Sequence, residues 1–584
     1  MSINGAGNEK ADVILLTHNR RDIVEKARAT AKQESFIYAP EASRTLLEGA
    51  ETFWQEWWIK RFDYYGQQVT NIATQNFPAN RYLSDGEKFL WQGLAIQFLS
   101  LPGYTKDGGG YLIQTPDNRK VIYVSDLIHS DGRVPDLYSF QNEIPEAKIG
   151  NYHGHLGRLD QWLKSIRKLK NLSVDSIVPA KGRAIDNPAE VLDRSEALAL
   201  SIYRNYLSTN ALHWYFGEDR MAKAAELVLG KEHGVKGMAF AEHIDLPEWC
   251  HHIGTTKLLV SKSGRGFILD AGGRNSLEAL FKYIKSGELT GYDGVFVTHT
   301  HNDHSAFVAD VVSEFQCPVY GVAKVTEVMK EPGGWHLPGV PNKPLPEMIA
   351  VKNGEKMLWQ EFSFTFFDFP GQMLNHGALL VEKEGDAPVF FIGDSFSPSG
   401  IDDYCLMNRN LLHDNTGYLK CFSILEEMSV NVWLVNQHIN HRFRFNRDEL
   451  DFLKGRYLNR RQMISRFVAW DDPNFGVDEQ WLSVYPYGQE SEQGATVSAR
   501  VNIWNHSPED RSFAVTVHGN RVVTPVQRKK DVKIKGGETG GLLFEFRIDP
   551  SAPKKVHVFT VDVHSAPGID EMHRAEGMIK ITGG

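Results

Sequence analysis

The feature that most constrains the fold of this chain is a short apolar run that leads directly into four potential metal ligands. Residues 295–297 are apolar, and the stretch that follows contains four imidazole or carboxylate side chains, which are His299, His301, Asp303 and His304. An apolar strand holds the backbone rigidly, so the loop after it can direct the first two side chains toward one metal ion and the last two toward a second. Imidazole and carboxylate groups suit zinc or a similar first-row ion. The pattern therefore predicts a metal site at the end of a strand.

This motif resembles the signature of the metallo-β-lactamase superfamily, in which His-x-His-x-Asp-His follows a strand. The resemblance covers residues from about 250 to 465 and implies later ligands in a fixed order. A Pro-Gly turn, a strand ending in Gly-Asp and a final strand supply the candidates, which are His376, Asp394 and His438. The implied ligand set is His299, His301 and His376 for one ion, Asp303, His304 and His438 for the other, and Asp394 for both.

One position departs from the family pattern. Many family members carry the third histidine directly after Pro-Gly, where this chain has Gln372, and His376 follows four residues later. We assign the ligand to His376 because glutamine is a weak neutral ligand and a longer loop can bring an imidazole inward.

Two further histidines are candidates for substrate binding. His441 competes with His438 for the last ligand position, and we interpret it as a neighbour of the site rather than as a ligand. His252 ends the cluster Trp249-Cys250-His251-His252, just ahead of the domain's first strand, where the family's loops approach the metal cavity. A loop histidine that is satisfied by ordinary hydrogen bonds is the alternative for His252.

The resemblance implies a metal-dependent hydrolase. A water held between two divalent ions, zinc in first place and manganese or iron as alternatives, loses a proton near neutral pH and becomes a nucleophile. Asp303 and Asp394 are the predicted catalytic carboxylates. The ions would also polarise the bond under attack, so no serine or cysteine nucleophile is needed. The substrate is expected to be a small molecule with an ester, lactone, amide, phosphate or sulfate bond, because the fold alone cannot choose among these.

Two other classes of function remain open at this stage. The first is an iron oxidoreductase on the same fold. Its flavodiiron type usually replaces a histidine of the motif with glutamate, whereas this chain retains His301. The second is a noncatalytic binding or scaffold protein, against which the nearly complete ligand set argues, since so many buried polar groups would be hard to satisfy without metal.

The N-terminal part of the chain contains a second series of the same landmarks in the same order. His18, Asp22 and Asp126 are retained, whereas Arg20 and Lys181 stand where histidines are expected. We predict that these two cations pair with the two carboxylates and replace the metal ions by buried salt bridges. The residues 1–205 are therefore expected to form a degenerate copy of the metal-binding domain, and the pair His153 and His155 is interpreted as loop histidines rather than as a rescued site.

Length and patterning predict the remaining organisation of the 584 residues. We expect a helical linker at 206–245, the catalytic domain at 246–476 and an immunoglobulin-like β-sandwich at 477–584, where apolar and polar residues alternate. Each of the two tandem α/β domains should be an αβ/βα sandwich of two mixed sheets with helices outside. The aromatic segment 46–66 is expected to be a helix that packs in a core or an interface.

Composition narrows the partners and the location. The formal net charge of −9 gives no attraction for nucleic acids or anionic membranes. The four scattered cysteines form no Cys-x-x-Cys pair, which argues against a structural zinc knuckle or a disulfide framework. No apolar run approaches about 18 residues and residues 1–10 lack a signal-peptide core, so the chain as written is expected to be soluble and cytoplasmic. A removed signal peptide and assembly into homo-oligomers stay open.

Overall fold

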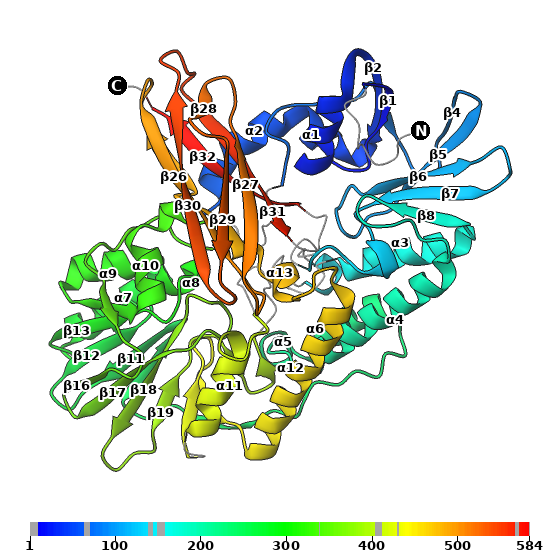
Figure 1. Ribbon diagram of the computed structural model, residues 1–584. Helices are drawn as coiled ribbons and strands as arrows, with labels where there is room; N and C mark the ends of the chain where they lie inside the picture. Colours follow the sequence, from blue (N-terminus) through cyan, green and yellow to red (C-terminus); the bar gives the residue numbers. More distant parts are fainter. Residues whose placement is uncertain are drawn as a thin grey trace.

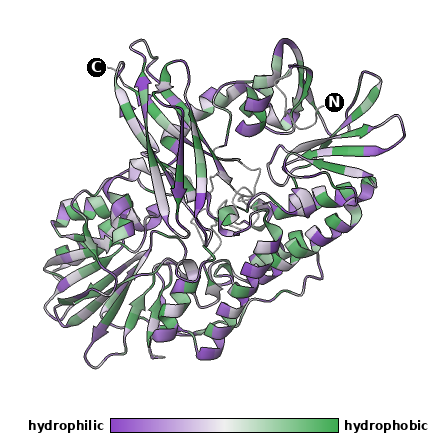
Figure 2. Ribbon diagram, in the orientation of Figure 1, coloured by the Kyte–Doolittle hydropathy of each residue, from purple (hydrophilic) through white to green (hydrophobic). Residues whose placement is uncertain are grey.

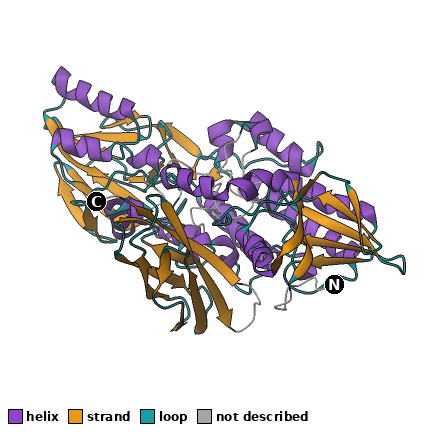
Figure 3. Cartoon of the chain, turned by 90° about the horizontal axis from the view of Figure 1, so that it is seen from above, coloured by secondary structure: helices purple, strands orange, loops and turns teal. Residues whose placement is uncertain are grey.

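A computed structural model of the protein describes residues 10–62, 71–137, 144–148, 158–337, 339–402, 411–428, 431–566 and 572–582. Figure 1 shows an N-terminal region in blue and cyan, a central domain in green and yellow, and a C-terminal sandwich in orange and red. Seen from above in Figure 3, helices concentrate in the middle of the molecule, with strand-rich regions on either side. None of the helices in the described ranges combines the length and the apolar character that a bilayer crossing requires.

The central domain contains two mixed sheets. The strands of the first, in spatial order, are β10 (Cys250–Ile253), β11 (Thr256–Val260), β12 (Arg265–Leu269), β13 (Gly291–Phe296), β14 (Val319–Val322) and β15 (Ile349–Val351). Those of the second are β16 (Lys356–Trp359), β17 (Phe362–Asp368), β18 (Gly377–Lys383), β19 (Val389–Phe391), β22 (Trp433–Val435), β23 (His441–Arg444) and β9 (Glu242–Asp245). Buried side chains of both sheets, such as Phe267 and Phe364, share one apolar core. The sheets therefore pack face to face.

Helices cover the outer faces of these sheets, as an αβ/βα sandwich requires. Those of the first half are α7 (Arg274–Ser286), α9 (Val308–Phe315) and α10 (Ala323–Lys330), and those of the second are α11 (Gly417–Glu427) and α12 (Arg447–Phe467). The strands β12 to β15 are parallel, and β19 is parallel to β22. Since the carboxyl ends of parallel strands meet at one edge of a sheet, the loops after β12, β13, β19 and β22 can form one site.

The linker predicted at 206–245 is only partly helical. The helices α5 (Leu212–Phe216) and α6 (Glu218–Leu229) fulfil the helical expectation, but β9 pairs with β23 at the edge of the second sheet. A linker segment thus joins the sheet because an unpaired edge strand offers a full row of backbone hydrogen-bonding groups.

The N-terminal region also contains two sheets. One is the parallel sheet of β1 (Ala11–Leu15), β2 (Ala31–Pro40) and β3 (Arg81–Leu83), and the other contains β4 (Lys88–Trp91), β5 (Leu94–Ser100), β6 (Gly109–Gln114), β7 (Lys120–Ser125) and β8 (Ser176–Pro179). Its main helices are α1 (Arg21–Thr30), α2 (Arg44–Lys60), α3 (Leu159–Leu172) and α4 (Pro188–Leu207). His18 follows β1 as His299 follows β13, and Lys181 follows β8 as His438 follows β22. His153 and His155 lie outside the described residues.

The C-terminal region is a sandwich of two sheets. One contains β24 (Leu482–Tyr485), β26 (Thr496–Trp504), β30 (Thr539–Ile548) and β28 (Val523–Pro525), and the other β25 (Gly488–Ser491), β32 (Met572–Ile581), β31 (Val556–Ala566), β27 (Arg511–His518) and β29 (Lys529–Ile534). Green and purple positions alternate along these strands in Figure 2. The predicted strands at 497–504, 512–517 and 556–563 are confirmed, because alternation buries every second side chain between the sheets.

The aromatic segment joins the N-terminal region to the sandwich. Trp54 and Trp57 of α2 pack in one cluster with Tyr487 of the sandwich, and Trp57 Nε1 donates a hydrogen bond of 2.9 Å to Tyr487 Oη. Close by, Arg21 Nη1 lies 2.9 Å from Glu576 Oε2 in a buried ion pair. The expectation of an interface is therefore confirmed for the described part of the segment, whereas 63–66 lie outside it.

We expect Trp57→Ala to weaken this contact by about 3–5 kcal/mol, because it removes a buried aromatic ring. Tyr487→Phe removes only the hydrogen bond and should cost about 1 kcal/mol. Denaturant unfolding midpoints measure both effects, with Phe452→Ala as the control because Phe452 is 45% exposed on α12. Equal midpoints for wild type and Trp57→Ala would show that α2 is held by other contacts.

Candidate metal centre

The predicted ligands lie on loops at the carboxyl ends of the central strands. His299 follows β13 and forms a backbone bridge with His376, which precedes β18. Gly393, just before Asp394, has φ 53°, and a Cβ atom there would lie 2.4 Å from His376 Nε2. Only glycine fits this close approach in a left-handed conformation. The Gly393-Asp394 pair therefore brings the Asp394 carboxylate close to the loop that contains His376.

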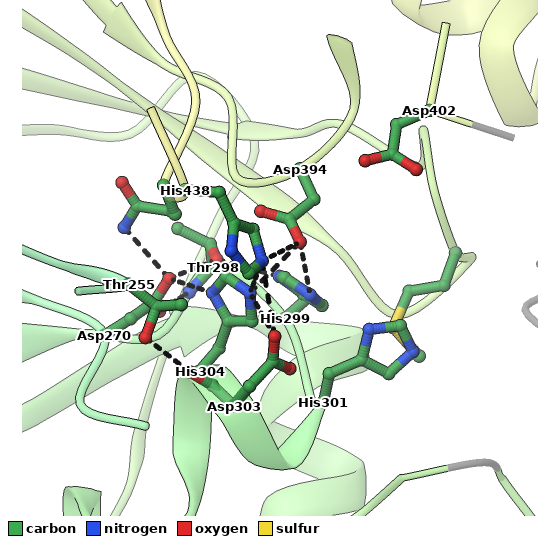
Figure 4. A network of polar contacts seen from close by, with 12 residues as sticks. Thr255, Asp270, Thr298, His299, His301, Asp303, His304, Asp394, Asp402 and His438 are labelled. Atoms are coloured by element: carbon green, nitrogen blue, oxygen red, sulfur yellow. Dashed lines mark hydrogen bonds and ion pairs between the residues drawn. The ribbon is translucent and has the colours of Figure 1, made fainter. Parts of the chain in front are cut away.

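Four of the predicted ligands form a compact cluster, which Figure 4 shows with its dashed contacts. Oxygen and nitrogen atoms of Asp303, His304, Asp394 and His438 all lie within 4.8 Å of one another. Asp394 Oδ2 is 3.1 Å from His304 Nε2 and 3.0 Å from His438 Nε2, and Asp303 Oδ2 is 3.3 Å from His438 Nε2. These residues are the ones expected at the second metal ion.

The histidines expected at the first ion lie beside this cluster but are less compact. The ring centroid of His299 is 4.8 Å from that of His376 and 4.8 Å from that of His301. His299 Nε2 is 3.9 Å from Asp394 Oδ2. Figure 4 shows His301 set apart from the other labelled histidines. All three imidazoles therefore lie close together without converging as tightly as the second set.

Several polar atoms at this place are buried without a hydrogen-bond partner among the described residues. They are His299 Nε2, both ring nitrogens of His376 and Asp394 Oδ1. Such atoms are rare in proteins because leaving them unsatisfied is costly. Nitrogen and oxygen lone pairs around one cavity are what a first-row metal ion takes up, so these residues fit the ions that the motif implies.

The cluster is also electrostatically prepared for cations. Burial alone would raise the pKa of Asp394, but the imidazoles of His304 and His438 hold it well below its usual range. Burial alone would lower the pKa of His438, but Asp394 and Asp303 raise it to about 10. The carboxylates thus stabilise positive charge between them. Divalent metal ions would supply more positive charge there than protonated imidazoles do.

A further buried carboxylate, that of Asp270, orients the ligand His304 through the ring nitrogen that faces away from the cluster. Asp270, directly after β12, accepts hydrogen bonds from His304 Nδ1 at 3.0 Å, Thr298 Oγ1 at 2.6 Å and Gln437 Nε2 at 2.9 Å. Its contact with Nδ1 leaves the Nε2 atom of His304 facing the cluster, as a metal ligand requires. Sequence reasoning missed Asp270, although its place at the end of an apolar strand beside β13 was a usable signal.

Neither candidate substrate-binding histidine touches the ligand cluster. His252 Nδ1 lies 2.8 Å from Nζ of Lys257, a fully buried lysine that also donates to Gln437 O at 2.7 Å. Burial lowers the pKa of Lys257 to about 7. His441 lies at the β23–β9 edge, with its ring centroid 6.4 Å from that of Trp214. Lys257 stands in an otherwise apolar strand, a pattern that had no functional interpretation in the sequence.

The corresponding place in the N-terminal region contains an ion-pair network. Lys181 Nζ lies 3.2 Å from Asp126 Oδ1 and 3.5 Å from Asp22 Oδ2, and His18 Nε2 lies 3.1 Å from Asp126 Oδ2. The predicted pairing of Lys181 with both carboxylates is confirmed. Arg20 stacks on the ring of Tyr104, 4.7 Å from its centroid, and contributes to the low pKa of Asp22.

Comparison with known proteins agrees with this geometry. The family model of the metallo-β-lactamase superfamily matches residues 255–401, which include every predicted ligand except His438. These residues therefore form a metallo-β-lactamase superfamily domain, and its αβ/βα fold is the one described above.

Two curated relatives are named hydroxyacylglutathione hydrolases. The protein of Marinomonas sp. (strain MWYL1) is 29% identical over 107 residues, which cover 18% of this chain and 34% of the relative. That of Hahella chejuensis (strain KCTC 2396) is 23% identical over 140 residues, which cover 24% of this chain and 46% of the relative. The chain thus spans less than half the length of either relative.

Solved structures of similar proteins include two metallo-β-lactamases. One, from Elizabethkingia meningoseptica, has 16% identity and a TM-score of 0.28, covering 39% of this chain and 99% of its own. The other, a class B3 di-zinc enzyme from an Alaskan soil metagenome, has 13% identity and a TM-score of 0.29, covering 38% of this chain and 95% of its own.

The third histidine can be tested against its neighbour. We expect His376→Ala to lower the metal bound per chain, because it removes an imidazole with two unsatisfied nitrogens, whereas Gln372→Ala should leave it unchanged. Elemental analysis after gel filtration measures both. The reverse result would reassign the ligand to Gln372.

The N-terminal network predicts a pH-dependent stability. Burial alone would raise the pKa of Asp126, but Lys181 and His18 lower it to about 2, below the value of about 3.9 in an unfolded chain. Its contribution to stability is therefore present above about pH 4 and is lost as the pH falls toward 2.

Lys181→Met should consequently destabilise the protein by on the order of 3 kcal/mol at pH 7. The deficit should be smaller at pH 3, because the carboxylates of the variant, which lacks the lysine, can bind protons there. Unfolding midpoints across this range provide the measurement. Lys168→Met is the control, since its partner Asp85 is 54% exposed and a surface pair contributes at most about 1 kcal/mol. A deficit that is independent of pH would contradict the ion-pair account.

Proposed function

We propose that the protein is a metal-dependent hydrolase of small molecules. The observation that carries this proposal is the compact cluster of Asp303, His304, Asp394 and His438 at the loop edge of a metallo-β-lactamase superfamily domain. The names of the curated relatives, both hydrolases, support the same class of reaction.

The proposed ligand set is His299, His301 and His376 for one ion, Asp303, His304 and His438 for the other, and Asp394 for both. Imidazole and carboxylate ligands favour zinc, with manganese and iron as the alternatives. When bound, two such ions supply a hydroxide nucleophile at neutral pH and polarise the bond under attack.

The residues of the chain provide orientation and access. Asp394 is buried between two imidazoles and fixes their relative positions, while Asp270 holds His304 from behind. The side chains of Asp303 and His438 are 41% and 34% exposed, whereas that of His304 is fully buried. Substrate therefore approaches from the side of Asp303 and His438, where these two side chains face solvent.

The substrate surface is proposed to extend from His438 toward the connecting segment. The ring centroid of Tyr215 in α5 lies 5.9 Å from that of His438, and Trp214 makes edge contacts with His243 and His441. His441 thus belongs to an aromatic rim beside the open ligands. His252, which is half-buried against Lys257, is proposed to act on this side of the cavity as well.

The bond that is cleaved is proposed to be an ester, lactone, amide, phosphate or sulfate. The relatives are named for the hydrolysis of hydroxyacylglutathione, so thioesters belong in the same screen.

The other regions are proposed to be supporting domains. The matching strand order and the placement of His18 and Lys181 support a degenerate second copy at 1–205, joined through 206–245 to the catalytic domain at 246–476. The two-sheet sandwich supports an immunoglobulin-like domain at 477–584.

Elemental analysis of wild type beside Asp394→Ala tests the function before any substrate is known. We expect about two zinc or manganese ions per chain in the wild type and fewer than one in the variant, because Asp394 is the proposed ligand of both. Asp293→Asn is the matched control, since Asp293 pairs with Arg265 in the same domain.

Two other outcomes would contradict the proposal. One bound iron with oxygen uptake would indicate an oxidoreductase on the same fold. No metal after gentle purification would favour a noncatalytic binding protein.

A further inference from the structure

A second buried aspartate, Asp402, is outside the ligand series of the family and lies near Asp394. After Asp394 the chain forms the short hairpin of β20 (Phe396–Ser397) and β21 (Gly400–Ile401), and Asp402 follows directly. The backbone N–H of Asp402 donates to Ser395 O at 3.1 Å, so the hairpin returns the chain to the residue next to Asp394. Figure 4 shows the Asp402 carboxylate extending toward the space between Asp394 and His301.

The side chain of Asp402 is held in place at one oxygen only. It is fully buried, and its Oδ2 atom accepts a hydrogen bond of 3.1 Å from Tyr215 Oη. Its Oδ1 atom is buried without a hydrogen-bond partner among the described residues. Asp394 Oδ1 and His299 Nε2 share this condition. Three buried atoms of metal-ligand type, one from each of these residues, thus have no hydrogen-bond partner among the described residues.

The charges around the Asp402 carboxylate also favour a bound cation. The known neighbours of the Asp402 carboxylate are the neutral groups of Tyr215 and Gln372, the carboxylate of Asp394 and the more distant imidazole of His438. Two neighbouring buried carboxylates repel each other, and a cation between them would relieve this repulsion.

Asp402 lies beside the position at which this chain departs from the family pattern. The family's usual third histidine is replaced there by a neutral amide, and this amide lies beside Asp402. The carboxylate of Asp402 would add a charged ligand beside this neutral amide.

We propose that Asp402 is an additional metal ligand, through Oδ1, for the ion held by His299, and that the hydrogen bond from Tyr215 orients it. This inference rests on the proposed function and adds a residue to its site. A second carboxylate beside the imidazoles makes the site harder, so it raises the affinity for manganese or iron relative to zinc.

The connecting segment thereby becomes part of the metal site. Tyr215 Oη also accepts a hydrogen bond of 2.8 Å from Asn436 Nδ2, and Asn436 Oδ1 accepts one of 2.8 Å from the backbone N–H of His438. Helix α5 therefore links the proposed extra ligand to the loop that presents the last histidine.

The test is Asp402→Asn in the full-length chain, which keeps the shape of the side chain and an acceptor for Tyr215. The protein is stripped with a chelator and then titrated with Zn²⁺ or Mn²⁺ alone, and bound metal is measured by elemental analysis. We expect the variant to lose one of about two bound ions, or to bind that ion with at least about 10-fold lower affinity. The loss should be larger for Mn²⁺ than for Zn²⁺.

Thermal unfolding of the metal-free proteins separates ligation from packing. Asp402→Asn removes a buried charge, so its metal-free unfolding temperature should equal or exceed that of wild type, while the rise on adding metal should be smaller. Tyr215→Phe should retain both ions with affinity reduced about 10–100-fold for one of them. Asp293→Asn is again the matched control and should behave as wild type.

Unchanged stoichiometry and affinity in Asp402→Asn, beside a wild type that binds two ions, would overturn this inference and leave the proposed function intact. A lower unfolding temperature of the metal-free variant, with equal losses for both metals, would make Asp402 a packing residue and overturn it as well. A wild type that binds no metal would instead overturn the proposed function.

Discussion

The structure of the central domain depends on how buried carboxylates are compensated. Asp394 and Asp270 lie in the interior at the edge where the two sheets meet, and each is surrounded by imidazole, hydroxyl or amide groups. An uncompensated buried carboxylate would be costly, so the loops after β12, β13, β19 and β22 must converge for the domain to be stable. The hydrogen bonds and ion pairs that stabilise the buried carboxylates at this edge also position the candidate metal ligands.

In the N-terminal region, buried carboxylates are compensated by a lysine. Its strands end in a comparable arrangement, but Lys181 lies between Asp22 and Asp126, where the central domain has the imidazole of His438 near Asp394. A lysine satisfies two carboxylates permanently, whereas imidazoles can release their protons and accept a metal ion. The residue types at the strand ends, with Arg20 after β1 and Lys181 after β8, thus separate an ion-pair network from a candidate metal centre.

Much of the candidate site could be predicted because its residues follow strands that are strongly apolar. The motif after residues 295–297 and the Gly-Asp pair at 393–394 carry both a structural and a chemical signal, and four of the predicted ligands do converge. The sequence does not fix the position of the third histidine of the first ion. The loop between Gln372 and His376 differs in length from the family pattern, so packing decides where the His376 imidazole lies. The strand β9 was placed in a linker because four exposed residues show no apolar alternation.

The sequence by itself determined the kind of chemistry at the strand ends, the alternating strands of the sandwich and the pairing of Lys181 with carboxylates in the N-terminal region. These are local signals, because each depends on residues that are close together in the chain. Only the tertiary structure decided that Lys257 lies under the site and that Tyr215 meets Asp402, a residue 187 positions away. Such contacts arise from the packing of loops and helices around a shared edge, and the free energy of that packing depends on many side chains at once rather than on any short pattern.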